Sequence, residues 1–66
     1  MEISLNGYTH QLENNSNIDT LIKQLELTGK RLAVEVNAEI IPRSQFDNYT
    51  LSAGDKVEIV HAIGGG

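Results

Sequence analysis

The stretch MEISLNGYTHQLENNSNIDTLIKQL, residues 1–25, changes its hydrophobic period once, and this change decides the fold. Residues 2–5 alternate between polar and apolar side chains, which is typical of a strand with one buried face. Asn6 and Gly7 follow, and both tolerate the positive φ angles of a tight type I′ turn. Residues 8–12 are therefore predicted to return as the second strand of a β-hairpin.

A single amphipathic helix is predicted after the hairpin. Its apolar side chains recur at helical spacing and form one stripe, made of Ile18, Leu21, Ile22 and Leu25. We expect the helix to begin at Ser16, whose hydroxyl would accept a hydrogen bond from a backbone N–H, with Asp19 completing a capping box. Gly29 is expected to cap the other end after about three turns.

The second half of the chain returns to the strand period. Alternation predicts a strand at residues 32–36, and a short apolar run predicts another at residues 39–41, with Asn37-Ala38 as the turn between them. The sequence that follows is less regular. It contains a predicted helical turn and two expected core anchors, Phe46 and Leu51.

The order of these elements predicts the fold class. Residues 56–62 form the last predicted strand, with Val57 and Ile59 facing the core. A right-handed crossover through the helix would place the first and last strands side by side and parallel. We therefore expect one α+β domain over residues 1–66, in which one helix packs across one face of a mixed sheet. This is the β-grasp arrangement.

Size and composition exclude several function classes. The chain has 66 residues, so it forms one domain, and nearly every apolar side chain must serve the core. A small-molecule pocket of roughly 300–1,000 Å³ would be difficult to enclose, which argues against an autonomous enzyme. The net charge of −4 disfavours a nucleic-acid partner, which needs a basic patch.

Metal and membrane functions also lack support in the sequence. There is no cysteine, and His10 and His61 have no further ligands at metal-site spacing. The N-terminus has neither a basic region nor an apolar run long enough for a signal peptide or a membrane span. We therefore expect a cytoplasmic protein that binds no metal or cofactor.

The run Gly64-Gly65-Gly66 is the candidate site. Glycines cannot support a sheet, and residues 63–66 are expected to form a flexible tail that reaches about 13 Å. Gly64 and Gly65 would thread a narrow channel and present the carboxylate of Gly66 to another enzyme. That carboxylate can attack ATP to give an acyl-adenylate, which a sulfur nucleophile converts to a thiocarboxylate. The alternative is a frayed tail with no role.

A docking surface is predicted beside the tail. Val60 and Ala62 are expected on the face of the sheet opposite the helix, with Ser4 and Ala33. Together with Ile63, the first two are the predicted partner-docking residues, because this face leads directly into the tail. The alternative is that they are isolated exposed apolar residues, which are ordinary.

Several segments together resemble the ThiS family, the ubiquitin-like sulfur carriers of thiamine (thiazole) biosynthesis. They are Leu5-Asn6-Gly7, residues 16–25, residues 33–37, Ile40-Ile41-Pro42-Arg43, residues 54–60 and Ile63-Gly64-Gly65-Gly66. The resemblance implies that a ThiF-type adenylyltransferase activates Gly66 with ATP and that a donor such as a cysteine desulfurase supplies the sulfur. The resulting 1-thioglycine at Gly66 would then pass its sulfur to the thiazole synthase ThiG.

Four alternatives stay open at this point. Two are other sulfur carriers, namely the small subunit of molybdopterin synthase and a carrier for tRNA thiolation or another sulfur pathway. The third is a ubiquitin-like modifier that is joined to lysines. The fourth is an inert structural domain.

Overall fold

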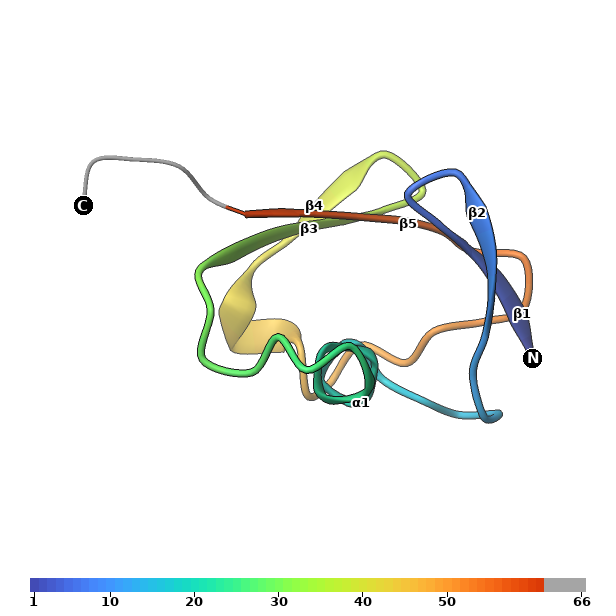
Figure 1. Cartoon of the computed structure of the whole chain (residues 1–66), viewed down its shortest axis with the longest axis horizontal. Coiled ribbons are helices and arrows are strands. Elements are labelled where there is room, and N and C mark those ends of the chain that lie inside the picture. The colour runs from blue at the N-terminus through green and yellow to red at the C-terminus, as the bar shows by residue number, and fades with distance from the viewer. Residues whose placement is uncertain (62–66) are drawn as a thin grey trace.

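The computed structural model describes residues 1–61, which form a five-stranded mixed sheet with one helix against one face (Figure 1). The elements are β1 (Glu2–Leu5), β2 (Tyr8–Gln11), α1 (Ile18–Gln24), β3 (Leu32–Val36), β4 (Glu39–Ile41), the 3-10 helix η1 (Arg43–Gln45) and β5 (Lys56–His61). The predicted α+β class and the predicted order of elements are confirmed.

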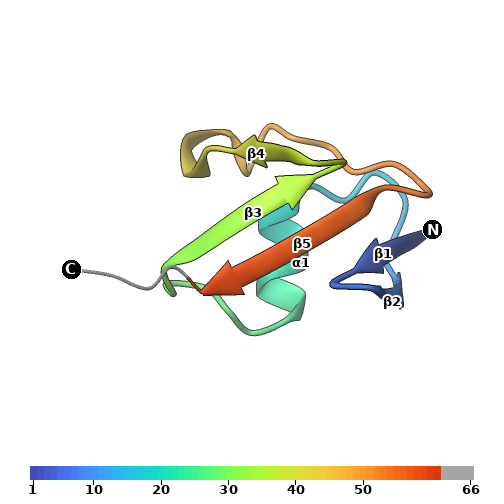
Figure 2. The same ribbon diagram turned by 90° about the horizontal axis from the view of Figure 1, so that it is seen from above.

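The last strand lies at the centre of the sheet. The strand order is β2-β1-β5-β3-β4, and Figure 2 shows β5 between β3 and β1 with α1 behind them. β5 pairs in parallel with β1, with Leu5 opposite Val57. On its other side β5 pairs antiparallel with β3, from Leu32 opposite His61 to Val36 opposite Val57. The predicted parallel pairing of the first and last strands is confirmed.

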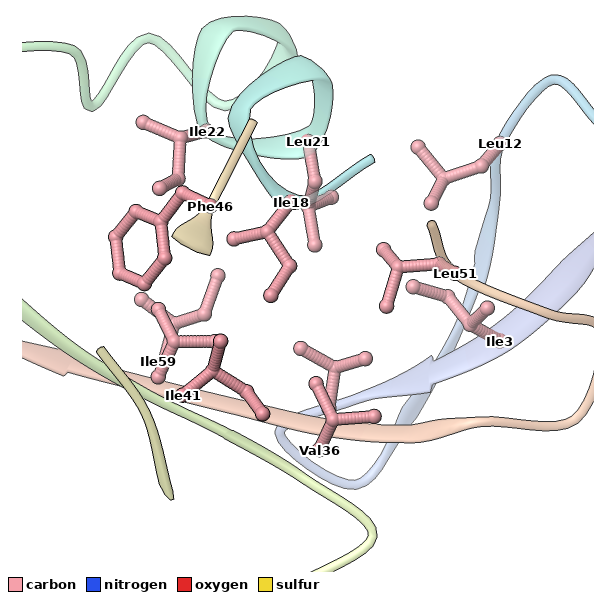
Figure 3. Close-up of a cluster of buried hydrophobic side chains, with 12 residues drawn as sticks. Ile3, Leu12, Ile18, Leu21, Ile22, Val36, Ile41, Phe46, Leu51 and Ile59 are labelled. Carbon is pink, nitrogen blue, oxygen red and sulfur yellow. The ribbon is translucent and has the colours of Figure 1, made fainter. Parts of the chain in front are cut away.

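The core fills the space between the sheet and the helix (Figure 3). Three of the four side chains of the predicted stripe are buried, and Leu25 packs against them from a half-buried position. Val57 and Ile59 face the core from β5, as predicted. The buried apolar side chains are Ile3, Leu12, Ile18, Leu21, Ile22, Val34, Val36, Ile41, Phe46, Leu51, Val57 and Ile59.

The start of α1 corrects the sequence prediction. Asn17 is the N-cap, because its side-chain oxygen accepts from the backbone N–H of Thr20 at 2.7 Å. Ser16 is buried one residue earlier, and its hydroxyl donates to the carbonyl of Glu13 at 2.7 Å. The hydroxyl is already used in the preceding turn, so the predicted capping box with Asp19 is wrong.

The irregular segment before β5 holds the beginning of the helix. The backbone N–H of Ile18 donates to the carbonyl of Tyr49, and that of Asp19 donates to the carbonyl of Phe46, each at 3.2 Å. These carbonyls satisfy N–H groups that a helix cannot satisfy itself. The two regions therefore stabilise each other.

The helix also ends earlier than predicted. Glu26 adopts a positive φ of 59°, and the N–H of Leu27 donates to the carbonyl of Ile22 at 3.0 Å, which is a Schellman cap. The chain reverses here because Leu27 turns back to pack against the core. Gly29, the predicted cap, also has a positive φ, but it lies in the turn that follows the cap. The helix α1 has 7 residues, about two turns, instead of the three predicted. Among residues 1–61 no helix has the length and apolar character to cross a membrane.

Both hairpins turn through two residues with positive φ. The angles are 50° and 86° at Asn6 and Gly7, and 52° and 69° at Asn37 and Ala38. The type I′ turn predicted at the first pair is confirmed, and the turn predicted at the second pair has the same form. Glycine adopts this backbone freely, whereas a Cβ costs roughly 1–2 kcal/mol there. A Cβ added at Gly7 would meet no atom within 4 Å, so only the backbone preference matters.

The two turns predict opposite effects for reciprocal substitutions. Gly7→Ala should lower the free energy of unfolding by about 1 kcal/mol, and Ala38→Gly should raise it by a similar amount. Urea unfolding followed by far-ultraviolet circular dichroism measures both. Changes of the same sign would show that the backbone angle does not control these positions.

Candidate functional site

The residues that the sequence predicts as the site lie at the end of β5 and beyond it. The glycines Gly64, Gly65 and Gly66 lie outside the described residues, as do the predicted docking residues Ala62 and Ile63. Val60 is described. The structure therefore shows the base to which the predicted tail is joined.

This base is a strand with neighbours on both sides. The pairing with β3 continues to His61, the last described residue, which lies opposite Leu32. The pairing with β1 stops earlier, at Leu5 opposite Val57, because the chain then turns into β2. Without a further partner, the peptide groups of Ile59 would face this side unpaired.

The side chain of Asn6 supplies that partner. Its Oδ1 accepts from the backbone N–H of Ile59 at 2.8 Å, and its Nδ2 donates to the carbonyl of Ile59 at 3.1 Å. The backbone N–H of Asn6 donates to the carbonyl of Val57 at 2.9 Å. The side-chain amide thus replaces a backbone peptide group and continues the ladder beyond the end of β1. Leaving such groups unpaired costs roughly 1–3 kcal/mol.

Asn37 does the same at the beginning of β5. Its Oδ1 accepts from the N–H of Lys56 at 2.9 Å, and its own N–H donates to the carbonyl of Lys56 at 2.8 Å. The asparagines of both hairpin turns therefore hold the central strand. From the sequence, Asn6 and Asn37 are predicted only as turn residues. Asparagine is the first residue of both hairpin turns, and this repetition is the sequence signal for the role. The signal can be interpreted only when the strand order is known, because the order places β5 next to both turns.

The face of the sheet opposite α1 carries exposed apolar side chains. Val60 is 59% exposed and lies opposite Ala33, and Ile40 is 74% exposed and lies opposite Glu35. Ser4, next to the buried Ile3, is on the same face. The predicted placement of Val60, Ala33 and Ser4 is confirmed, and Ile40 is a further exposed apolar residue on this face that was not predicted.

Residues 1–61 contain no group of side chains suited to bind a metal ion, because their histidine and acidic side chains form no group of three that could hold one. A ring nitrogen of His10 lies 2.6 Å from the side-chain oxygen of Gln24, and this contact joins the first hairpin to the helix.

A surface hollow of about 340 Å³ lies between the end of α1 and η1, where Arg43 Nη2 donates to the carbonyl of Lys30 at 2.7 Å. Its lining residues do not include Val60 or the rest of β5.

Comparison with known proteins agrees with this architecture. Residues 3–66 match the model of the ThiS family. The chain belongs to the ThiS family. The crystal structure of the ThiS protein from Geobacter metallireducens superposes on this ThiS-family chain with a TM-score of 0.87, at 30% identity and over the whole of both chains. The sheet and helix are therefore a ubiquitin-like β-grasp fold.

Relatives extend the ThiS similarity to two kinds of protein. The sulfur carrier protein ThiS of Escherichia coli K12 is 27% identical over 66 residues, which is the whole of both chains. That of Bacillus subtilis 168 is 39% identical over 49 residues, 74% of each chain. The thiazole synthase of Paramagnetospirillum magneticum AMB-1 is 35% identical over 66 residues, all of this chain. The chain spans only 20% of that protein.

Removing the side-chain amide of Asn6 should loosen the end of β5. Asn6→Gly keeps the positive φ without strain, so its effect reports the lost hydrogen bonds and the added chain entropy. We expect the free energy of unfolding to fall by about 1–2 kcal/mol and the amide hydrogen of Ile59 to exchange faster. The exposed loop residue Asn14 gives the matched control, Asn14→Gly. Unchanged exchange at Ile59 would contradict the assigned role.

Proposed function

We propose that this chain is a sulfur carrier for thiazole formation in thiamine biosynthesis, and that the carboxylate of Gly66 carries the sulfur. One observation supports this most strongly: the glycine run follows the central strand of a ThiS-family body almost directly, after Ala62 and Ile63. The whole-length similarity to the sulfur carrier of Escherichia coli supports the same role.

The chemistry follows from the carboxylate. Its unperturbed pKa is about 3.3–3.7, so it is ionised near neutral pH and can attack the α-phosphorus of ATP, releasing pyrophosphate. The acyl-adenylate is open to attack by a persulfide of a sulfur donor such as a cysteine desulfurase, with AMP as the leaving group. Cleavage of the resulting disulfide by a thiol leaves a thiocarboxylate on Gly66.

We assign the catalysis to partner enzymes in the cytoplasm, where ATP is at hand, and a carrier's role to this chain. A ThiF-type adenylyltransferase would bind the ATP, while Gly64 and Gly65 pass through a channel too narrow for side chains. Val60, Ala62 and Ile63 would contact the surface around that channel. The carrier would need no resident cofactor.

Thiazole synthase is the proposed acceptor of the sulfur. The supporting observation is that two thiazole synthases contain a region 35% identical to this chain, each over all 66 residues and 20% of its own length. In such a protein the carrier-like region and the remainder belong to one polypeptide, which favours a working relationship between the two.

Thiocarboxylate formation tests the function directly. The chain is incubated with the adenylyltransferase, ATP and a persulfide donor, and its intact mass is measured. We expect an increase equal to the difference between sulfur and oxygen. Deletion of Gly65 and Gly66 should abolish this increase and ATP–pyrophosphate exchange while the circular dichroism spectrum stays the same.

The products also separate the alternatives. Adducts of higher mass on other proteins would indicate a ubiquitin-like modifier. Delivery of the sulfur to molybdopterin instead of the thiazole would indicate the small subunit of molybdopterin synthase. Exchange that survives the deletion would contradict the assignment of Gly66.

The docking role of Val60 predicts a separate effect. Val60→Asp places a charge on the exposed face beside the tail, so affinity for the adenylyltransferase should fall about tenfold or more, without a change in the circular dichroism spectrum. Tyr8→Asp is the matched control, because Tyr8 is 79% exposed on the edge strand β2. Equal affinity for the two variants would remove Val60 from the docking surface.

A further inference from the structure

Two carboxylates face each other on the open side of the sheet. Glu35 of β3 and Glu58 of β5 lie directly opposite in the antiparallel register. Both alternate with core residues along their strands, so both project from the face opposite α1. Glu35 is half-buried and Glu58 is exposed. Lys56 lies on the same face two residues before Glu58, but within residues 1–61 it makes no ion pair with either carboxylate.

This arrangement is unfavourable for the free chain. Side chains directly opposite in an antiparallel pair have Cβ atoms about 4.5–5.5 Å apart, and like charges at such positions are destabilising.

Apolar side chains flank the carboxylates. Ile40 lies opposite Glu35 on β4, so the order across three strands is Ile40, Glu35, Glu58. Val60 follows Glu58 on the same face of β5 and lies opposite Ala33. We call these five residues the outer patch. It joins the end of β5, where the described chain stops.

We propose that the outer patch binds an arginine side chain of the adenylyltransferase, held between Glu35 and Glu58; this proposal rests on the proposed function. A guanidinium group carries donors on a planar fork that can reach two carboxylates. Its apolar faces suit contact with Ile40 and Val60. Binding would remove the repulsion between the carboxylates and add two charge-assisted hydrogen bonds.

Charge disfavours the other occupants at the Glu35–Glu58 pair. Lys56 lies on the same face of the sheet, but a second copy of the chain seated directly on the pair would bring four carboxylates together. A nucleic acid would meet the patch with the same sign of charge. A cationic protein surface is the partner chemistry that remains, and the net charge of −4 favours its approach.

The test uses ATP–pyrophosphate exchange by the adenylyltransferase, measured against the concentration of the full chain. The variants are Glu35→Gln, Glu58→Gln and the double variant, which keep size and remove charge. Glu13→Gln, in the loop after β2, removes the same charge elsewhere. Each single variant should raise KM roughly tenfold at unchanged kcat, because the carboxylate of Gly66 is untouched.

Two further readouts distinguish a binding role from a structural one. One arginine shared by both carboxylates makes the substitutions non-additive, so the double variant should raise KM by clearly less than the product of the two single effects. Raising the ionic strength should raise KM for the unchanged chain much more than for the double variant. The double variant should also resist urea at least as well as the unchanged chain.

Three outcomes would overturn the inference. If Glu35→Gln and Glu58→Gln have the same KM as Glu13→Gln, and exchange is intact, the outer patch does not bind the adenylyltransferase. The proposed function is unaffected by that result. Weaker binding to thiazole synthase with normal exchange assigns the carboxylates to a different partner. No exchange with the unchanged chain rejects the proposed function, and the inference with it.

Discussion

The central strand β5 must have its backbone groups paired on two sides, although neither β1 nor β3 pairs with it along its whole length. The structure meets this constraint with side chains. The amide of Asn6 pairs both peptide groups of Ile59, and Asn37 pairs both peptide groups of Lys56. The two hairpin turns are consequently parts of the sheet's hydrogen-bond network, and the position of the strand that leads to the glycine run depends on them.

The strands and their faces follow from local periodicity, which is why they were predictable. Alternation in residues 2–5, 32–36 and 56–61 assigns a core side to each strand, and the crossover rule then places the first and last strands together. The ends of the helix were not predictable in this way. Ser16 and Asn17 are equally good caps, and contacts with residues 46–51 decide between them. The Schellman turn falls on a glutamate, a residue with no preference for positive φ.

The candidate site likewise has features that strand alternation predicts and features that depend on the pairing of distant strands. Val60 and Ala33 could be placed on the open face because strand alternation determines side-chain direction. The opposition of Glu35 and Glu58 depends on the register between β3 and β5, which hydrophobic alternation determines only to within steps of two residues. Like charges directly opposite each other in a sheet are destabilising in general, and here they lie beside exposed Ile40 and Val60.

The parallel arrangement of β1 and β5 also has a mechanical consequence. A pull along the strand axis, applied to the residues after His61, acts across the ladders on both sides of β5. Those hydrogen bonds run across the direction of pulling, so they are loaded together in shear instead of being opened one after another. The folded domain would therefore resist a pulling force that a partner applies to the residues after His61, and the sheet would stay intact.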